Sequence, residues 1–130
     1  MVKIILITHG NLGDCLLDTA QSICGCNKPN ISFFSVTGKV NLEEIEQKIK
    51  TSLGKDGSLI LVDSFGGTSC NIALKCAEKN KGVYVICGIN LCMILSALHN
   101  QEHLNAEELA TKLLEDGKKA IFEATEFLKK

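Results

Sequence analysis

Hydrophobic positions along the chain alternate between short continuous runs and stripes at helical spacing. Short apolar runs predict strands at Val2–Ile7, Ile31–Val36, Ser58–Val62 and Gly82–Cys87. The first run is rich in β-branched residues and is predicted to be buried on both faces. Between them, apolar residues recur every three or four positions, which indicates amphipathic helices. Strand followed by helix, four times over, predicts an α/β fold: a doubly wound, mainly parallel four-stranded sheet with helices on both faces.

Short polar residues mark the expected helix starts. Asn11, Asn90 and Asn105 open helical stripes, Asn41 can cap the second helix, and Ser69 or Thr68 can cap the third. These side chains favour N-cap positions because their oxygens accept a hydrogen bond from an unpaired backbone N–H.

The final stretch, residues 117–130, fits two structures. Ala120, Ile121, Ala124 and Leu128 continue a helical stripe. Gly117 weakens that helix, and the sequence AIFEAT is also compatible with a short strand. No internal repeat, linker or low-complexity tract divides the chain. We therefore expect residues 1–130 to form one domain, either a free-standing subunit or a fragment of a longer protein.

Charge narrows the classes of partner. The 130 residues include 14 basic and 15 acidic side chains, for a net charge of −1. This balance produces no field that favours nucleic acid or an anionic membrane, so we expect charged partners to be recognised locally. The run VKIILI is too short to span a bilayer or to form the core of a signal peptide.

The chain contains seven cysteines, an odd number whose spacing fits no disulfide framework or zinc site. Most lie in apolar stretches, where cysteine behaves as a small hydrophobe. They predict reduced thiols and a cytoplasmic protein. Cys24 and Cys26 could bind a metal, but no second pair stands at ligand spacing, so we expect neither metal nor cofactor.

Ligand sites of open parallel sheets lie beyond the carboxyl ends of the strands, where the strand order reverses. His9 follows the first predicted strand and precedes a helix whose dipole favours the neutral imidazole, a nucleophile. Asp63 follows the third strand and is its expected partner if these strands are neighbours. A carboxylate that accepts from one ring nitrogen leaves the other free to attack. The alternatives are a loop histidine bonded to backbone and a turn or capping aspartate.

The motif DSFGGTS follows the third strand. Its glycines permit close backbone approach, and the N–H groups of the following helix start can hold an anion. Neither a P-loop nor a GxGxxG motif is present, so we expect a single phosphoryl group. The histidine, the carboxylate that orients it and the anion-binding turn together predict a phosphohistidine at His9, with Asp63 as its catalytic partner. The expected phosphoryl-binding residues are Gly10, Phe65, Gly66, Gly67, Thr68 and Ser69. His99 and His103 are expected on the surface, in the connection after a helix, and neither site loop offers a lysine or arginine as a phosphate clamp.

Three stretches together resemble the mannose-family enzyme IIA domain of the bacterial phosphoenolpyruvate-dependent sugar phosphotransferase system: IILITHGNLGDCLLDTAQSI, LILVDSFGGTSCNIA and VYVICGINLCMILSAL. The resemblance covers nearly the whole chain. It implies that His9 takes a phosphoryl group from the phosphocarrier protein HPr and passes it to an enzyme IIB, which phosphorylates the incoming sugar through membrane-embedded subunits. It also implies that Asp63 pairs with the histidine, and that a homodimer forms by exchange of an added C-terminal antiparallel strand.

Two positions depart from the family pattern. The family often has proline where Ser69 stands and a larger apolar residue where Cys70 stands, which affects packing near the turn more than chemistry. A phosphoryl-donor subunit for dihydroxyacetone kinase and a phosphorylation-controlled regulatory module remain as alternative functions, with a small-molecule binding module as the general alternative. The intact FGGT turn favours sugar transport, and the lack of a DNA-binding segment argues against the regulator.

Overall fold

The computed structural model describes residues 1–26, 30–38 and 40–129 and has the predicted α/β architecture. Its elements are, in chain order, β1 (Lys3–Thr8), α1 (Leu12–Cys24), β2 (Ile31–Ser35), α2 (Leu42–Ser52), β3 (Ser58–Val62), α3 (Thr68–Lys79), β4 (Val83–Cys87), α4 (Leu91–Asn100), α5 (Ala106–Lys119) and the 3-10 helix η1 (Ala124–Leu128). All four predicted strands are confirmed, with boundaries that differ by at most one residue at either end.

The four strands form one parallel sheet in the order β2-β1-β3-β4. The central strands β1 and β3 pair from Lys3 opposite Ser58 to Ile7 opposite Val62. The chain runs outward from β1 to β2, crosses back to β3 and then continues outward to β4. The strand order therefore reverses between β1 and β3, which places the switch point at the carboxyl ends of these two strands.

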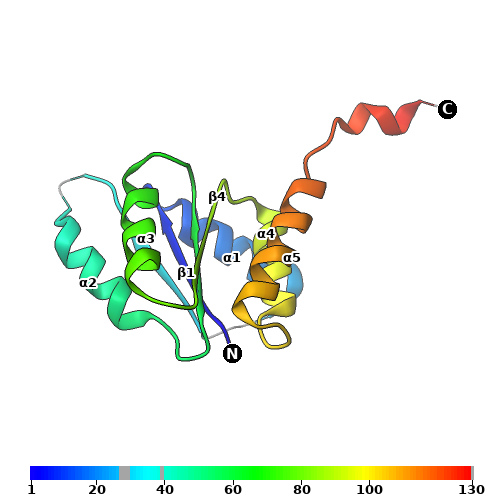
Figure 1. The fold of residues 1–130 in the computed structure, drawn as a ribbon. Helices are drawn as coiled ribbons and strands as arrows, with labels where there is room; N and C mark the ends of the chain where they lie inside the picture. Colours follow the sequence, from blue (N-terminus) through cyan, green and yellow to red (C-terminus); the bar gives the residue numbers. More distant parts are fainter. Residues whose placement is uncertain (27–29, 39, 130) are drawn as a thin grey trace.

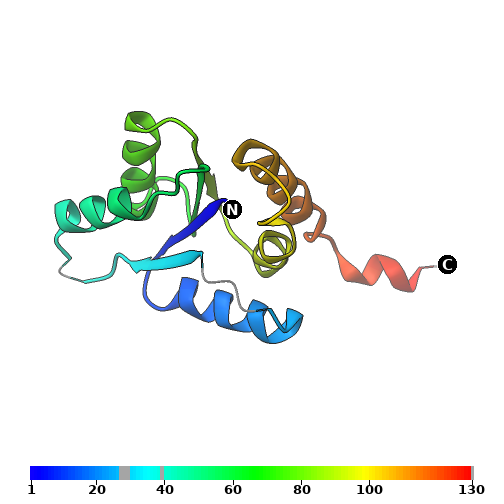
Figure 2. The ribbon, with the colours of Figure 1, turned by 90° about the horizontal axis from the view of Figure 1, so that it is seen from below.

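Helices cover both faces of the sheet, which gives three layers (Figure 1 and Figure 2). Helices α1, α4 and α5 pack on one face, and α2 and α3 pack on the other. Ile4 and Leu6 face the first layer, whereas Ile5 and Ile7 face the second, and all four are fully buried. A strand buried on both faces is held firmly, so β1 provides a rigid base for the residue that follows it.

Three of the asparagines cap helices, as their positions suggest. Asn41, Asn90 and Asn105 each accept a hydrogen bond from the backbone N–H three residues later. Asn105 also forms a reciprocal capping box with Glu108, whose side chain accepts from the Asn105 backbone N–H at 3.1 Å.

The cap predicted at Thr68 or Ser69 is wrong. Both residues lie inside α3, and its N-cap residue is Gly67, which has no side chain to accept a hydrogen bond. The helix therefore starts one residue earlier than a hydroxyl cap at Thr68 would allow, and its first N–H groups remain available to a ligand.

The C-terminal segment forms neither of the two structures that the pattern allows. Helix α5 continues through Gly117 to Lys119, and the short helix η1 then projects from the body of the protein (Figure 1 and Figure 2). Gly117 has a packing reason inside α5: a Cβ there would lie 2.7 Å from Cε of Met93. Glycine thus lets α5 approach α4 closely.

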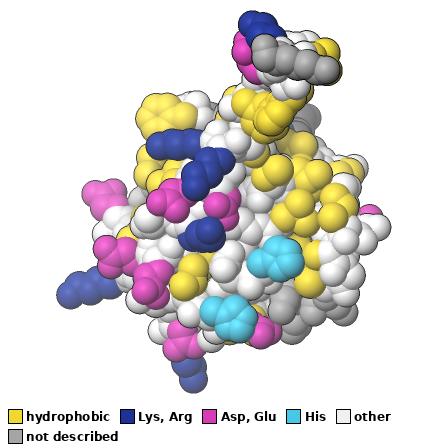
Figure 3. Space-filling model, turned by 90° about the vertical axis from the view of Figure 1, so that its right-hand side faces the viewer, with side chains coloured by type: hydrophobic (Ala, Val, Ile, Leu, Met, Phe, Trp, Pro, Cys, Tyr) yellow, Lys and Arg dark blue, Asp and Glu magenta, His cyan; other side chains and the backbone are white. Residues whose placement is uncertain are grey.

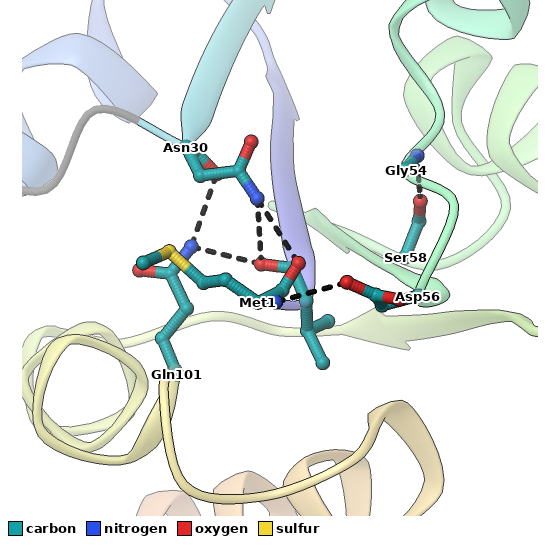
Figure 4. A network of polar contacts seen from close by, with 7 residues as sticks. Met1, Asn30, Gly54, Asp56, Ser58 and Gln101 are labelled. Carbon is teal, nitrogen blue, oxygen red and sulfur yellow. Dashed lines mark hydrogen bonds and ion pairs between the residues drawn. The ribbon is translucent and has the colours of Figure 1, made fainter.

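The amino-terminal edge of the sheet is joined by a polar network (Figure 4). Gln101, directly after α4, is fully buried and donates from Nε2 to the carbonyl oxygens of Val2 at 2.9 Å and Asn30 at 3.0 Å. The Asn30 amide donates to the same Val2 carbonyl at 3.2 Å, and the N-terminal ammonium of Met1 pairs with Asp56 at 3.0 Å. These contacts connect α4 to the beginnings of β1 and β2. Across the described ranges, no helix combines the length and apolar character needed to cross a membrane.

Candidate functional site

His9 is the first residue beyond β1 and lies at the carboxyl edge of the sheet. Gly10 follows with φ of +54°, a left-handed conformation that favours glycine and turns the chain from β1 into α1. The His9 side chain is 50% exposed. Its base is therefore held by a buried strand while its ring is accessible from solvent.

Asp63, the first residue beyond β3, contacts His9 twice through one oxygen. Its Oδ2 accepts the His9 backbone N–H at 2.8 Å and lies 2.8 Å from Nδ1 of the ring, and its side chain is only 11% exposed. Its other oxygen, Oδ1, accepts the backbone N–H of Ser64 at 3.0 Å. The expected pairing of His9 with Asp63 is confirmed, because β1 and β3 are neighbours.

This contact sets the chemistry of the ring. A carboxylate beside Nδ1 stabilises the tautomer that carries its proton on Nδ1, which leaves the lone pair on Nε2. Within the described ranges, Nε2 of His9 has no hydrogen-bond partner. The ring therefore presents an oriented nucleophilic nitrogen at the surface.

The pKa of Asp63 is lowered from its ordinary value. Burial raises this pKa, but the His9 backbone N–H and imidazole, together with the Ser69 hydroxyl, lower it by more. Hydrogen bonds to the charged form of a carboxyl favour ionisation. Asp63 is thus a carboxylate at neutral pH, able to stabilise positive charge on the imidazole ring.

The DSFGGTS loop brings the N-terminus of α3 beside this pair. A Cβ on Gly67 would lie 3.6 Å from Cε1 of His9, so the backbone at Gly67 borders the ring directly. The first N–H groups of a helix have no intrahelical acceptor and lie at the positive end of its dipole. The Oγ of Ser69, in the first turn of α3, is buried; it helps to lower the pKa of Asp63, but it makes no hydrogen bond of good geometry within the described ranges. The arrangement can hold an anion next to Nε2.

The remaining predicted site residues form the rim. A Cβ on Gly10 or on Gly66 would meet nothing within 4 Å, so both border open space. Thr68 begins α3 and is half-buried. Phe65, within the DSFGGTS loop, is 81% exposed and presents an apolar ring to solvent. The hollow between α2 and α3, of about 450 Å³, reaches Thr68 and Asn71 but includes neither His9 nor Asp63. The candidate site is therefore an open surface.

The other two histidines lie elsewhere. His99 and His103 are exposed, as expected, although His99 belongs to the last turn of α4 and not to the connection after it. Both flank Gln101, which contacts the beginning of β1 at the amino-terminal edge of the sheet. They therefore lie at the edge opposite His9. In the ranges that the structure describes, no cluster of three or more metal-ligating side chains could hold a metal ion.

Sequence reasoning missed two residues that position the site. Asn11 precedes α1 but does not cap it; the buried hydroxyl of Thr8 accepts the Gly13 backbone N–H at 2.8 Å instead. A Cβ on Gly13 would lie 2.7 Å from the Phe33 ring, so glycine is needed for α1 to pack there. A threonine at a strand end gives no sequence signal for such a role, because the bond depends on the conformation of the turn between Thr8 and Gly13.

Comparison with known proteins agrees with the fold and the sequence motifs. The family model for the PTS system fructose IIA component (EIIA-man) matches residues 3–114. The PTS system fructose-specific EIIA component of Bacillus subtilis is 29% identical, over 100% of this chain and 91% of its own length. The mannose-specific EIIAB component of Escherichia coli K12 is 27% identical over 92% of this chain, and the chain spans 38% of that relative.

Among solved structures, the mannose/sorbose-specific IIA subunit of the phosphotransferase system from Enterococcus faecalis superimposes with a TM-score of 0.83 at 28% identity, over 94% of this chain and 93% of that one. The family model covers most of the chain, and the solved structure has the same fold. This chain belongs to the EIIA-man family of IIA components of the phosphotransferase system.

Proposed function

We propose that this chain is a phosphoryl carrier that accepts a phosphoryl group from phospho-HPr on Nε2 of His9 and passes it to a cognate enzyme IIB for sugar uptake. The observation that carries the proposal is the Asp63 carboxylate 2.8 Å from Nδ1, with Nε2 uncommitted at the surface. The chain belongs to the EIIA-man family of phosphotransferase-system components, and phosphoryl transfer is the class of reaction that fits this family.

In the accepting step, the Nε2 lone pair attacks phosphorus and the bond between phosphorus and the donor breaks. The ring becomes positively charged, and Asp63 stabilises that charge while holding the proton on Nδ1. The N–H groups of the first turn of α3 offset the negative charge on the transferred oxygens. In the donating step, the same bond at Nε2 breaks as the acceptor attacks from outside.

The shape of the site supports a protein partner. His9 is half exposed on an open surface. Leu12, three residues after His9, and Phe65, two residues after Asp63, are apolar and are 46% and 81% exposed. A small substrate usually lies in an enclosed pocket. An open histidine with an apolar rim instead suits successive contacts with HPr and enzyme IIB. The abundance of cysteines without framework spacing supports a reducing, cytoplasmic setting for both reactions.

The C-terminal segment supports a homodimer. Its large apolar side chains, Ile121, Phe122, Phe127 and Leu128, are 61% to 80% exposed. Figure 3 shows the side from which the segment projects, with further hydrophobic side chains gathered below it. The strand β4 has β3 as its one neighbour in the described sheet. We propose that the segment packs on a second copy of the chain, as the family resemblance implies for an exchanged strand.

Radiolabelled phosphoenolpyruvate, enzyme I and HPr test the proposal. The protein should take up one acid-labile phosphoryl group, and His9→Ala should abolish labelling. His99→Ala and His103→Ala are matched controls that should be labelled normally. Labelling that survives in His9→Ala would overturn the site. Transfer from the labelled protein to an enzyme IIB supports sugar uptake, whereas transfer to the nucleotide subunit of dihydroxyacetone kinase would contradict it.

A further inference from the structure

Two thiols meet between the first turn of α3 and the end of β4. Cys70 is the third residue of α3 and is fully buried, and Cys87 is the last residue of β4 and is half-buried. Their Sγ atoms lie 3.5 Å apart, in van der Waals contact, and both are reduced. The phosphoryl-transfer chemistry proposed above uses neither thiol, so their contact calls for its own explanation.

Each thiol belongs to a segment that shapes the candidate site. Cys87 pairs in register with Val62, the residue before Asp63, and the backbone N–H of Gly88 donates to the Val62 carbonyl at 3.0 Å. Cys70 follows Ser69 in the turn whose first backbone atoms border the His9 ring. A bond between these sulfurs would therefore join the strand ends that carry Asp63 to the turn that is proposed to hold the phosphoryl group.

We propose that Cys70 and Cys87 form a redox modification site, where a peroxide produces a disulfide that ties α3 to β4 and slows phosphoryl transfer to His9. The effect on transfer rests on the proposed function. The formation of the disulfide does not.

The chemistry is a two-step oxidation. Cys87 is the more exposed residue of the two, so its thiolate attacks a peroxide oxygen, the O–O bond breaks, and a sulfenic acid and hydroxide form. The Cys70 sulfur then attacks the sulfenic sulfur, and the hydroxyl group leaves as water. Two thiols and one hydrogen peroxide thus yield one disulfide and two waters, with the thiols oxidised and the peroxide reduced.

The environment makes the reaction slow and its product durable. Burial, together with contact with the Cys70 thiol, raises the pKa of Cys87 to about 11. Little thiolate is present at neutral pH, so the pair stays reduced without a peroxide. A thiolate of high pKa is also a poor leaving group, so the disulfide resists exchange once it has formed.

The bond would shift the site. A disulfide requires its sulfurs at about 2.05 Å, so the 3.5 Å contact must shorten by about 1.5 Å. Cys70 lies within a helix and Cys87 within a sheet, so rotation of the side chains and a displacement of the α3 turn share this movement. Misplacement of a reacting group by about 1 Å can lower a rate 100-fold. We expect phosphoryl acceptance to slow about tenfold or more.

Peptide mapping tests the disulfide. Cys92→Ser serves as the parent protein, because trypsin then places Cys70 in peptide 56–75 and Cys87 as the only cysteine of peptide 82–112. After treatment with hydrogen peroxide and alkylation with N-ethylmaleimide, mass spectrometry should find these two peptides joined. Cys87→Ser and Cys70→Ala should each abolish the cross-link, whereas Cys15→Ser, which removes an exposed thiol of α1, should retain it. Recovery of both thiols as alkylated peptides, while the exposed cysteines are oxidised, would overturn the proposal.

Phosphoryl acceptance tests the consequence on the same samples. The oxidised parent should accept the phosphoryl group from phospho-HPr about tenfold more slowly than the reduced parent, and dithiothreitol should restore the rate. Oxidised Cys87→Ser should react at its reduced rate. An unchanged rate in a fully cross-linked sample would overturn the effect on transfer. If the reduced protein accepts no phosphoryl group at all, the proposed function fails, and the mass of the joined peptides still decides the disulfide.

Discussion

At the scale of single residues, one oxygen of Asp63 sets both the position and the tautomer of His9. It accepts the backbone N–H and lies against Nδ1, each at 2.8 Å, so the loop after β1 and the ring are held by the same atom. Histidine alone at a strand end could serve many roles. The neighbouring carboxylate removes most of them, because it leaves Nε2 as the one nitrogen with a free lone pair.

The lowered pKa of Asp63 predicts a specific dependence of stability on acid. The folded protein holds this carboxyl ionised below its ordinary pKa of about 4. The stabilisation is therefore complete above pH 4 and is lost as the pH falls through the lower folded-state value, because the unfolded chain binds the proton first. Urea unfolding from pH 6 to pH 2 should show the wild-type protein losing more free energy of unfolding than Asp63→Asn. Parallel losses in the two proteins would contradict this role.

Gly67 predicts a loss of function that leaves the fold in place. In Gly67→Ala the new methyl group would lie 3.6 Å from Cε1 of His9, beside the nitrogen proposed to carry the phosphoryl group. We expect the rate of phosphoryl acceptance from phospho-HPr to fall about tenfold to 100-fold. Stability should fall by about 1 kcal/mol at most, the effect of alanine at an N-cap.

Gly66→Ala is the matched control for that variant. Gly66 has φ of +84°, so alanine there is strained by about 1–2 kcal/mol. Its Cβ would meet nothing within 4 Å, however, and would leave the His9 ring unobstructed. Stopped-flow rates and urea unfolding of both variants should separate crowding from strain. A larger rate loss in Gly66→Ala than in Gly67→Ala would show that the backbone at Gly67 does not border the phosphoryl group.

At the scale of elements, the sequence predicts what local patterns determine. The four strands and the caps at Asn41, Asn90 and Asn105 follow from residue type and spacing, and the structure confirms them. The start of α3 does not follow, because Gly67 takes the N-cap position where a hydroxyl residue was expected. The free-energy difference between neighbouring residues at an N-cap is small. The approach of the turn to His9 is a tertiary constraint, and it outweighs that difference.

The contacts of the candidate site likewise include some that the sequence could predict and some that it could not. The pairing of His9 with Asp63 could be expected once β1 and β3 were taken as neighbours, since both residues end buried strands. The supporting bond from Gly13 to Thr8 and the contact between Cys70 and Cys87 could not be expected. The first joins a backbone N–H of α1 to a hydroxyl at the end of β1, and the second joins two thiols. Both distances depend on how a helix packs on the sheet, and no periodicity in the sequence encodes them.

Gln101 predicts a loss of stability without a loss of function. Its buried Nε2 satisfies the carbonyl oxygens of Val2 and Asn30 (Figure 4). Gln101→Ala removes one donor from each carbonyl, while the Asn30 amide still donates to Val2 and the Ile4 backbone N–H still donates to Asn30. The free energy of unfolding should therefore fall by about 1–2 kcal/mol. Phosphoryl acceptance should be unchanged below the unfolding transition, because His9 lies at the opposite edge of the sheet.

His103→Ala provides the control for Gln101→Ala, since it removes an exposed side chain two residues away. Its effect on stability should stay within about 0.5 kcal/mol. Chemical denaturation of the two variants gives the comparison. Equal stability of Gln101→Ala and the wild-type protein would mean that water replaces the lost amide, and the network would then not hold this edge together.

At the scale of the whole molecule, the two edges of the sheet have different roles. The amino-terminal edge is joined by buried hydrogen bonds between α4 and the beginnings of β1 and β2. The carboxyl-terminal edge presents an exposed histidine, open glycines and an exposed phenylalanine. The proposed contact with two protein partners in turn needs an accessible surface, and the rigidity that orients the site comes from the buried strands beneath.

The C-terminal segment predicts how the chain associates. Residues 121–129 are exposed throughout, and Phe122 and Phe127 contact each other with ring centres 5.3 Å apart, outside the two core clusters. Such exposed apolar side chains are typical of surfaces that a partner covers. Analytical ultracentrifugation should find the full chain as a dimer, and a variant that ends at Ala120 as a folded monomer. The double variant Phe122→Ser, Phe127→Ser should also be monomeric, whereas Glu123→Gln should remain dimeric. A monomeric full chain would overturn the dimer. A dimer that persists without residues 121–130 would place the contact between copies elsewhere, since the apolar side chains of this segment then contribute nothing to it.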